Sequence, residues 1–263
     1  MQHPTESRGH VYCAGPLFNQ SEREEMTAIA DLLCQAGYTV YLPHRDGMEF
    51  RHVHASLINL GWDAATAGKF LHQAIFALDV YQLVDACGAV VWNLNGRVPD
   101  EGAVSEAAIA WTLGKPIVAY KEDVRSMIAG RDNPLLAGLV QFELITQMDQ
   151  ILPTLEREWA RHAALSPIGP TRLMPHVLNA VHQGRDLWQA MRRMTSPEDN
   201  DSLAEVIEQL FSPGKLYSGD RTAAAAREEQ RADPIAADGR ALKGSPVDGV
   251  TLSHRNRTTT LTR

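Results

Sequence analysis

The sequence has few cysteines and no spacing typical of a metal site or a dinucleotide site. Its three cysteines, Cys13, Cys34 and Cys87, are odd in number and far apart, which argues against a disulfide framework or a cysteine-ligated zinc ion. The sequence also lacks an HExxH motif, a GxGxxG loop and a Walker-type loop. We therefore expect neither a metal nor an organic cofactor.

Long apolar runs and an excess of basic residues are absent as well. No stretch reaches the roughly 18 apolar residues that a membrane-spanning helix needs. Residues 1–10 are polar, include Pro4 and lack the apolar segment of a signal peptide. The formal net charge of −7 excludes a chain built mainly to bind the phosphates of nucleic acid. These features predict a cytoplasmic protein that binds neither membrane nor nucleic acid.

Short apolar segments alternate with helical patterns through the first half of the chain. Apolar residues recur at helical spacing behind Ser21 and Glu24, whose S-x-x-E spacing predicts a capping box. Strand following helix at these intervals predicts a flavodoxin-like, doubly wound α/β fold with a parallel sheet of about five strands. The expected strands are residues 10–14, 38–42, 89–94, 115–120 and 141–145, and the expected helices are near 22–36, 70–83 and 103–113.

The remainder of the chain differs in character from this α/β part. We place the α/β domain at residues 1–147 and a helical extension at 148–212, with helices at 154–164, 175–194 and 202–211 that pack on the α/β core or on a second subunit. Residues 213–263 contain few large apolar side chains, so burial cannot offset the entropy of ordering them. This segment is predicted to be a mostly disordered tail.

The loop after the expected strand 89–94 carries several acids. Ligands of open parallel sheets bind beyond the carboxyl ends of the strands, where this loop lies. Asp100 belongs to the loop, and Glu106 is predicted in the first turn of a helix beginning near Gly102, where the helix dipole favours an ionised carboxylate. One carboxylate that attacks carbon and a second that protonates a leaving group are what glycosidic chemistry requires. Acids in a first helical turn are also common as simple caps, so the pattern alone leaves both interpretations open.

Three motifs together resemble the nucleoside 2-deoxyribosyltransferase family. They are Tyr12–Phe18 (YCAGPLF), Leu42–Asp46 (LPHRD) and Asp100–Glu106 (DEGAVSE), the last of which is similar to the family's D-x-G-x-x-x-E signature. The segment Leu113–Val118 (LGKPIV) is similar to what usually follows it. The resemblance extends over about residues 10 to 125.

This resemblance implies a role for each matching residue. Glu106 corresponds to the nucleophile that binds C1′ of 2-deoxyribose covalently, Asp100 to the acid that helps the base leave, and Tyr12 to the tyrosine that orients the nucleophile. Asp79 is a candidate for a further acid near the base, and a solvated helix acid is the alternative. The implied substrate-binding residues are Gly15, Phe18, Asp79, Asn95 and Gly102. Members of the family are homo-oligomers and need no cofactor, and both are expected here.

The sequence also departs from the family pattern. Gly88 stands where an aspartate is usual before the central strand, Ala103 where a threonine is common, and Ala107-Ala108 where isoleucine-glycine is usual. The first loop contains Asn19-Gln20-Ser21 rather than the glycine- and arginine-rich phosphate loop of the deoxynucleoside monophosphate hydrolases in the same superfamily.

Three functions follow from these observations. The first is an enzyme that transfers 2-deoxyribose between bases through a glycosyl-glutamate intermediate. The second is an N-glycosidase that hydrolyses nucleosides or their 5′-monophosphates. The third is a non-catalytic module that senses nucleotides, which the departures from the family pattern would fit. Because Asp100 and Glu106 are both present, we favour an enzyme.

Overall fold

The computed structural model describes residues 7–126, 130–164, 173–194 and 200–212. The predicted tail, residues 213–263, lies outside the described residues. The domain boundaries at 147 and 212 stay predictions. None of the helices in the described ranges combines the length and apolarity needed to cross a bilayer.

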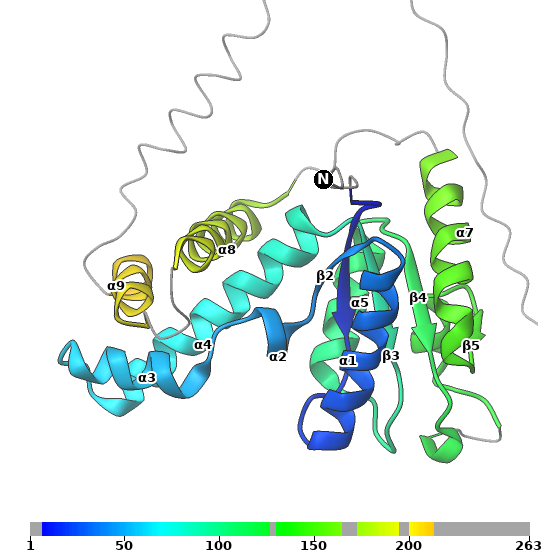
Figure 1. Ribbon diagram of the computed structural model, residues 1–263, viewed down its shortest axis with the longest axis horizontal. Coiled ribbons are helices and arrows are strands. Elements are labelled where there is room, and N and C mark those ends of the chain that lie inside the picture. The colour runs from blue at the N-terminus through cyan, green and yellow to red at the C-terminus, as the bar shows by residue number, and fades with distance from the viewer. Residues whose placement is uncertain (1–6, 127–129, 165–172, 195–199, 213–263) are drawn as a thin grey trace, which may run out of the picture. The chain divides into compact units, whose positions relative to one another are not determined.

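A five-stranded parallel sheet forms the centre of the protein (Figure 1). Its strand order, β2-β1-β3-β4-β5, and the helices on both faces confirm the predicted flavodoxin-like, doubly wound α/β fold. The central strand β3 is buried along its whole length, because both faces of the sheet are covered. The strands are β1 (His10–Ala14), β2 (Thr39–Tyr41), β3 (Ala89–Asn93), β4 (Ile117–Tyr120) and β5 (Leu144–Ile145).

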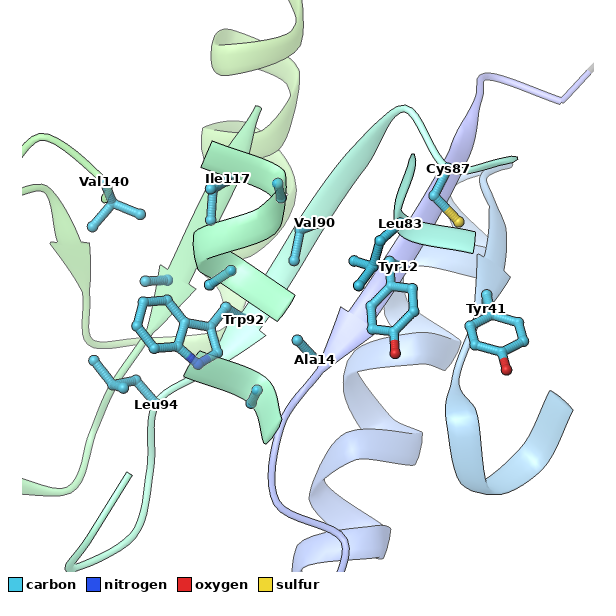
Figure 2. Close-up of a cluster of buried hydrophobic side chains, with 14 of the residues drawn as sticks. Tyr12, Ala14, Tyr41, Leu83, Cys87, Val90, Trp92, Leu94, Ile117 and Val140 are labelled. Atoms are coloured by element: carbon cyan, nitrogen blue, oxygen red, sulfur yellow. The ribbon is translucent and has the colours of Figure 1, made fainter. Parts of the chain in front are cut away.

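Helices cover both faces of the sheet. Helices α1 (Gln20–Gln35) and α7 (Ile151–Ala164) bury apolar side chains against Val11, Cys13 and Val91 on the first face. On the second face, α5 (Glu101–Thr112) packs its alanines against Tyr12 and Trp92 (Figure 2). Side chains along a strand alternate between the two faces of the sheet, so Tyr12 and Ala14 lie on the same face. Trp92 is aligned with Ala14 in the β1–β3 pair, and it therefore shares the α5 side with Tyr12.

Helix α4 (Ala64–Tyr81) is longer than the predicted helix at 70–83, because Asp63 caps it at an earlier residue. A π-helical turn, Gln82–Ala86, follows it and leads into β3. Pro43, the residue after the predicted strand 38–42, begins a short helix. The other helices and turns are α2 (Pro43–Asp46), α3 (Phe50–Asn59), α6 (Pro134–Gly138) and the 3₁₀ turns Val124–Ser126 and Met148–Gln150.

The C-terminal helices pack within the same chain. Helix α8 (Pro175–Arg193) lies along α4, and α9 (Asn200–Phe211) lies against α3 (Figure 1). Their buried residues Leu187, Leu203 and Ile207 join side chains of α3 and α4 in one apolar cluster. Helices predicted at 175–194 and 202–211 are therefore present, with their apolar faces buried on α3 and α4.

The capping box predicted for α1 is displaced by two residues. The N-cap is Asn19, whose side chain accepts a hydrogen bond from the backbone N–H of Glu22, and the Glu22 side chain accepts one from the N–H of Asn19. Ser21 is thus a helical residue and not the cap. Both spacings satisfy the capping-box pattern, and the structure uses the one that begins at Asn19.

Candidate active site

A tyrosine on the sheet and a glutamate on α5 meet at the centre of the candidate site. The Oη of Tyr12 donates a hydrogen bond to Oε1 of Glu106 over 2.7 Å, although the two residues are 94 positions apart. Tyr12 is fully buried, and its ring is held within the apolar cluster shown in Figure 2. The pairing of Tyr12 with Glu106 that the resemblance implies is therefore present in the structure.

Glu106 lies deeper in α5 than predicted. The helix begins at Glu101, so Glu106 is its sixth residue and belongs to the second turn, not the first. Burial raises the pKa of Glu106 to about 8; the hydrogen bond from Tyr12 lowers it, and the charge of Asp79 raises it further. The predicted place of Glu106 in the first helical turn is therefore wrong, and burial shifts its pKa in the direction opposite to that expected at a helix N-terminus.

A second tyrosine holds a second acid beside this pair. The Oη of Tyr41 donates to Oδ1 of Asp79 over 3.3 Å. Burial raises the pKa of Asp79 to about 7, and hydrogen bonds from Tyr41 and Tyr12 oppose this rise. Asp79 is therefore a partly buried acid next to Glu106, which contradicts the alternative of a solvated helix residue.

The two tyrosines lie side by side because their strands are in register. Tyr12 is aligned with Tyr41 in the β1–β2 pair, and the ring centroids are 5.3 Å apart. Their hydroxyl groups point the same way (Figure 2). Sequence reasoning missed Tyr41. The signal that could have found it is a tyrosine within each of two consecutive strands, because adjacent parallel strands can bring such residues together.

Asp100 caps the helix that carries Glu106. Its Oδ1 accepts a hydrogen bond from the N–H of Ala103 over 2.6 Å. Burial raises the pKa of Asp100, and the backbone hydrogen bond from Ala103 opposes this. A side chain at Gly102 would place its Cβ 3.2 Å from Oδ1 of Asp100, so glycine leaves room for the cap. Asp100 also contributes to raising the pKa of Glu106.

Two of the predicted substrate-binding residues make scaffold contacts, and a third is exposed. A Cβ at Gly15 would overlap the sulfur of Met26, so glycine is needed there for packing. Phe18 is 77% exposed in the loop before α1. Asn95 donates to Glu25 and accepts from the backbone of residues 122 and 123, which ties the loop after β3 to helix α1 and to the loop after β4. Among the hydrogen bonds of the described residues, none joins these three to Tyr12 or Glu106, and their contact with substrate stays a prediction.

Comparison with known proteins identifies the family. The family model described as nucleoside 2-deoxyribosyltransferase matches residues 11–165. The chain belongs to the nucleoside 2-deoxyribosyltransferase family. A solved structure titled as that of a conserved protein from Enterococcus faecalis V583 is 18% identical, has a TM-score of 0.42, and covers 57% of this chain and 98% of its own. None of the curated proteins compared with the chain matches it.

The structure explains how this member of the nucleoside 2-deoxyribosyltransferase family accommodates its departures from the pattern. A Cβ at Gly88 would approach the Trp159 ring of α7 to 3.0 Å, so the large indole is matched by a glycine there. Ala103 and Ala107 are buried against the sheet, where small side chains let α5 approach Tyr12 closely.

The carboxyl and hydroxyl groups at the site of this family member are suited to proton transfer and to attack on a carbon atom. In the described parts of the chain, no group of three or more histidine, cysteine, aspartate or glutamate side chains is arranged to hold a metal ion. Asp79 and Glu106 are each directed at a tyrosine hydroxyl. Such an arrangement can hold one carboxylate for attack on carbon and a second carboxyl group as a proton carrier.

Proposed function

We propose that the protein cleaves the N-glycosidic bond of 2′-deoxynucleosides and transfers the 2-deoxyribosyl group to another base. The observation that carries the proposal is the 2.7 Å hydrogen bond from Tyr12 to Glu106. The charges of Asp79 and Asp100 both raise the pKa of Glu106, so the three acids act on one another at this site. Membership of the nucleoside 2-deoxyribosyltransferase family supports a nucleoside as the substrate.

The first step forms a bond between Glu106 and the sugar. One carboxylate oxygen of Glu106 attacks C1′, the bond from C1′ to the base nitrogen breaks, and the base departs with that electron pair. Asp100 donates a proton to the departing base; burial raises its pKa, so it holds a proton more readily than a solvated aspartate. Tyr12 keeps its hydrogen bond to the other carboxylate oxygen and so fixes the direction of attack.

The second step releases Glu106. A nitrogen of the incoming base attacks C1′ from the opposite face, the ester bond to Glu106 breaks, and the carboxylate is restored beside the Tyr12 hydroxyl. Asp100 takes up the proton that the incoming base loses. Two inversions at C1′ give net retention of configuration. Transfer to a base rather than hydrolysis requires that water be kept from this ester until the base arrives.

Asp79 controls the charge of the nucleophile. Burial raises the pKa of both Asp79 and Glu106, to about 7 and about 8, so both carboxyl groups hold a proton more readily than solvated acids do. The reactive form is the one with the proton on Asp79 and the charge on Glu106. The hydrogen bond from Tyr12 is shorter than the one from Tyr41, 2.7 Å against 3.3 Å, and by lowering the pKa of Glu106 it favours the charge on that carboxylate.

The test is chromatography of 2′-deoxyinosine incubated with adenine and the purified protein. We expect 2′-deoxyadenosine and hypoxanthine to appear. Glu106→Gln should abolish both, whereas Glu101→Gln, an exposed acid on the same helix, should retain them. After acid quenching with 2′-deoxyinosine alone, intact-mass measurement should show one 2-deoxyribosyl group on the wild-type chain and none on Glu106→Gln.

Other outcomes would change the assignment. Free base and free 2-deoxyribose, without a new nucleoside, would identify a hydrolase that uses the same carboxylate. No turnover of several 2′-deoxynucleosides and their 5′-monophosphates would contradict the proposal and favour a nucleotide-sensing module. Turnover that survives Glu106→Gln would contradict the role of Glu106.

A further inference from the structure

Helix α8 lies outside the family-matched residues 11–165, yet it reaches the candidate site. It crosses α4 at Gly184, where a Cβ would overlap the carbonyl oxygen of Ala77 and approach Cβ of Tyr81 to 2.5 Å. The two helices can be this close only because residue 184 has no side chain. The absence of a side chain at Gly184 therefore determines how closely α8 packs against α4.

Trp188 follows Gly184 by one helical turn and faces the sheet. Its ring meets Tyr41 edge-on, with the centroids 5.7 Å apart and the ring planes at 77°. Trp188 and Met191 both pack against the cluster that contains Tyr12 and Tyr41. A continuous set of rings thus leads from α8 through Tyr41 to Tyr12, and the hydroxyls of the two tyrosines hold Asp79 and Glu106.

Tyr41 needs such a neighbour because of its place in the sheet. Strand β2 is at the edge and pairs with β1 alone. The Tyr41 ring is therefore covered by Tyr12 from the adjacent strand, while its outer side has no strand beside it. Trp188 supplies a rigid surface there, and edge-to-face contact of two aromatic rings favours one relative orientation.

We infer that Trp188 is a positioning residue of the site: by packing edge-on against Tyr41 it fixes the direction of the Tyr41 hydroxyl, and with it the hydrogen bond that Asp79 accepts. For its effect on catalysis the inference rests on the proposed function. Trp188 does not touch the reacting atoms and acts through Tyr41.

The charged and titratable groups around Asp79 come from several elements. Tyr12 on β1, Tyr41 on β2 and Glu106 on α5 interact with Asp79, and Asp46 on α2 acts on Tyr41. On α8, the Arg192 guanidinium lies 5.9 Å from the centre of the Trp188 ring. Because the hydrogen bond from Tyr41 lowers the pKa of Asp79, loosening Tyr41 should let this pKa rise.

The first experiment measures activity in a double-mutant cycle. Trp188→Leu keeps an apolar side chain but removes the ring, and we expect kcat to fall about 10-fold or more while KM changes little, since the cost is misplacement of a catalytic group. Trp188→Phe keeps a ring edge and should restore most of the rate. In a Tyr41→Phe background, Trp188→Leu should have no further effect, because the hydroxyl it positions is gone.

Val177→Ala is the matched control. Val177 is a partly buried residue of the same helix that packs with Val80 and Val181, in a different cluster from Tyr41. It should weaken the packing of α8 without changing kcat. An equal loss of kcat in Val177→Ala, or an undiminished effect of Trp188→Leu in the Tyr41→Phe background, would overturn the inference.

The second experiment does not depend on turnover. The melting temperature is measured against pH for the wild type and for Asp79→Asn. The two curves separate between the pKa of Asp79 in the unfolded chain and its pKa in the folded protein, so the pH at which their divergence is complete reports the folded-state pKa. When the same comparison, with and without Asp79→Asn, is made in the Trp188→Leu background, this divergence should move to higher pH. In the Trp188→Phe background it should stay in place. A shift here in a protein that turns over no nucleoside would refute the proposed function while supporting the inference. An unchanged divergence in Trp188→Leu would refute the inference, whatever the activity.

Discussion

Glu106 is a carboxyl group buried beside a second carboxyl group, and this has a cost for the folded state. Its pKa rises from 4.5 to about 8 on folding, mainly through burial. The folded protein therefore binds the Glu106 proton more tightly than the unfolded chain does across this window. Stability is highest below about pH 4.5 as far as this group is concerned, and it declines as the pH rises to 8. Such a loss of stability is common where function requires a reactive group to be buried.

Replacing Glu106 by glutamine should therefore stabilise the protein at high pH. We expect Glu106→Gln to raise the free energy of unfolding by about 2 kcal/mol at pH 8.5 and to leave it almost unchanged at pH 4.5. Thermal unfolding of both proteins across this range measures the difference. Glu101→Gln, on the exposed side of α5, should shift the melting temperature little at either pH. A stability difference for Glu106→Gln that is the same at both ends of the range would contradict the burial of this charge.

Two substitutions around Glu106 should shift the pH dependence of activity in opposite directions. The hydrogen bond from Tyr12 lowers the pKa of Glu106, so Tyr12→Phe should move the rising acidic limb of kcat/KM to higher pH. The charge of Asp79 raises that pKa, so Asp79→Asn should move the same limb to lower pH. The measurement is kcat/KM for 2′-deoxyinosine between pH 5 and 9. Shifts of the same sign in both variants would show that the limb belongs to another group.

The sequence indicates most of these residues, but not all of them. Tyr12, Asp100 and Glu106 lie within local motifs and can be named from those motifs alone. The contribution of Tyr41 depends on strand register, and that of Trp188 depends on how two helices cross, so neither is encoded in a local pattern. The raised pKa of Glu106 is likewise a result of tertiary burial, which the helix position alone does not reveal.

At the scale of secondary-structure elements, α1 shows what capping contributes. Asn19 and Glu22 satisfy each other's backbone groups, and Glu22 also accepts the N–H of Phe18. This cap holds the loop that connects β1 to α1. The helix itself could be predicted from apolar periodicity, whereas its first residue could not, because two overlapping sequence patterns fit equally well.

Asn19→Ala should destabilise the protein by about 1 kcal/mol, because the N–H of Glu22 loses its acceptor. Ser21→Ala, at the position that the sequence pattern favours, should change the free energy of unfolding by less than about 0.5 kcal/mol. Both positions are exposed, so the comparison isolates the cap from packing. Urea unfolding of the two variants checks this prediction; an equal loss in both would mean that the cap is not localised on Asn19.

At the scale of the whole molecule, α8 and α9 complete a helical layer rather than standing apart. They bury the outer sides of α3 and α4, and α8 also reaches the cluster around Tyr41. The existence of both helices could be predicted from the sequence. Their packing partner could not, because an amphipathic helix does not specify which apolar face it covers.

The close crossing of α4 and α8 should make Gly184 intolerant of a side chain. Gly184→Ala should lower the free energy of unfolding by about 1–3 kcal/mol, because the added methyl group meets the backbone of α4. Gly68→Ala is the matched control on α4: nothing lies within 4 Å of its Cβ, and the change should stabilise the helix by about 0.5–1 kcal/mol. Denaturant unfolding distinguishes the two, and a neutral Gly184→Ala would contradict the crossing.

The shortness of the two outermost strands has a consequence for how copies of this chain can meet. Strand β2 has three residues and β5 has two, so each border of the sheet offers few free backbone groups. An incoming extended segment would find almost no ladder on which to grow, and this guards against fibril formation by strand addition. Within the described part of the chain, helix surfaces and loops are therefore the better-suited surfaces for contact between folded copies, because their side chains can select a partner.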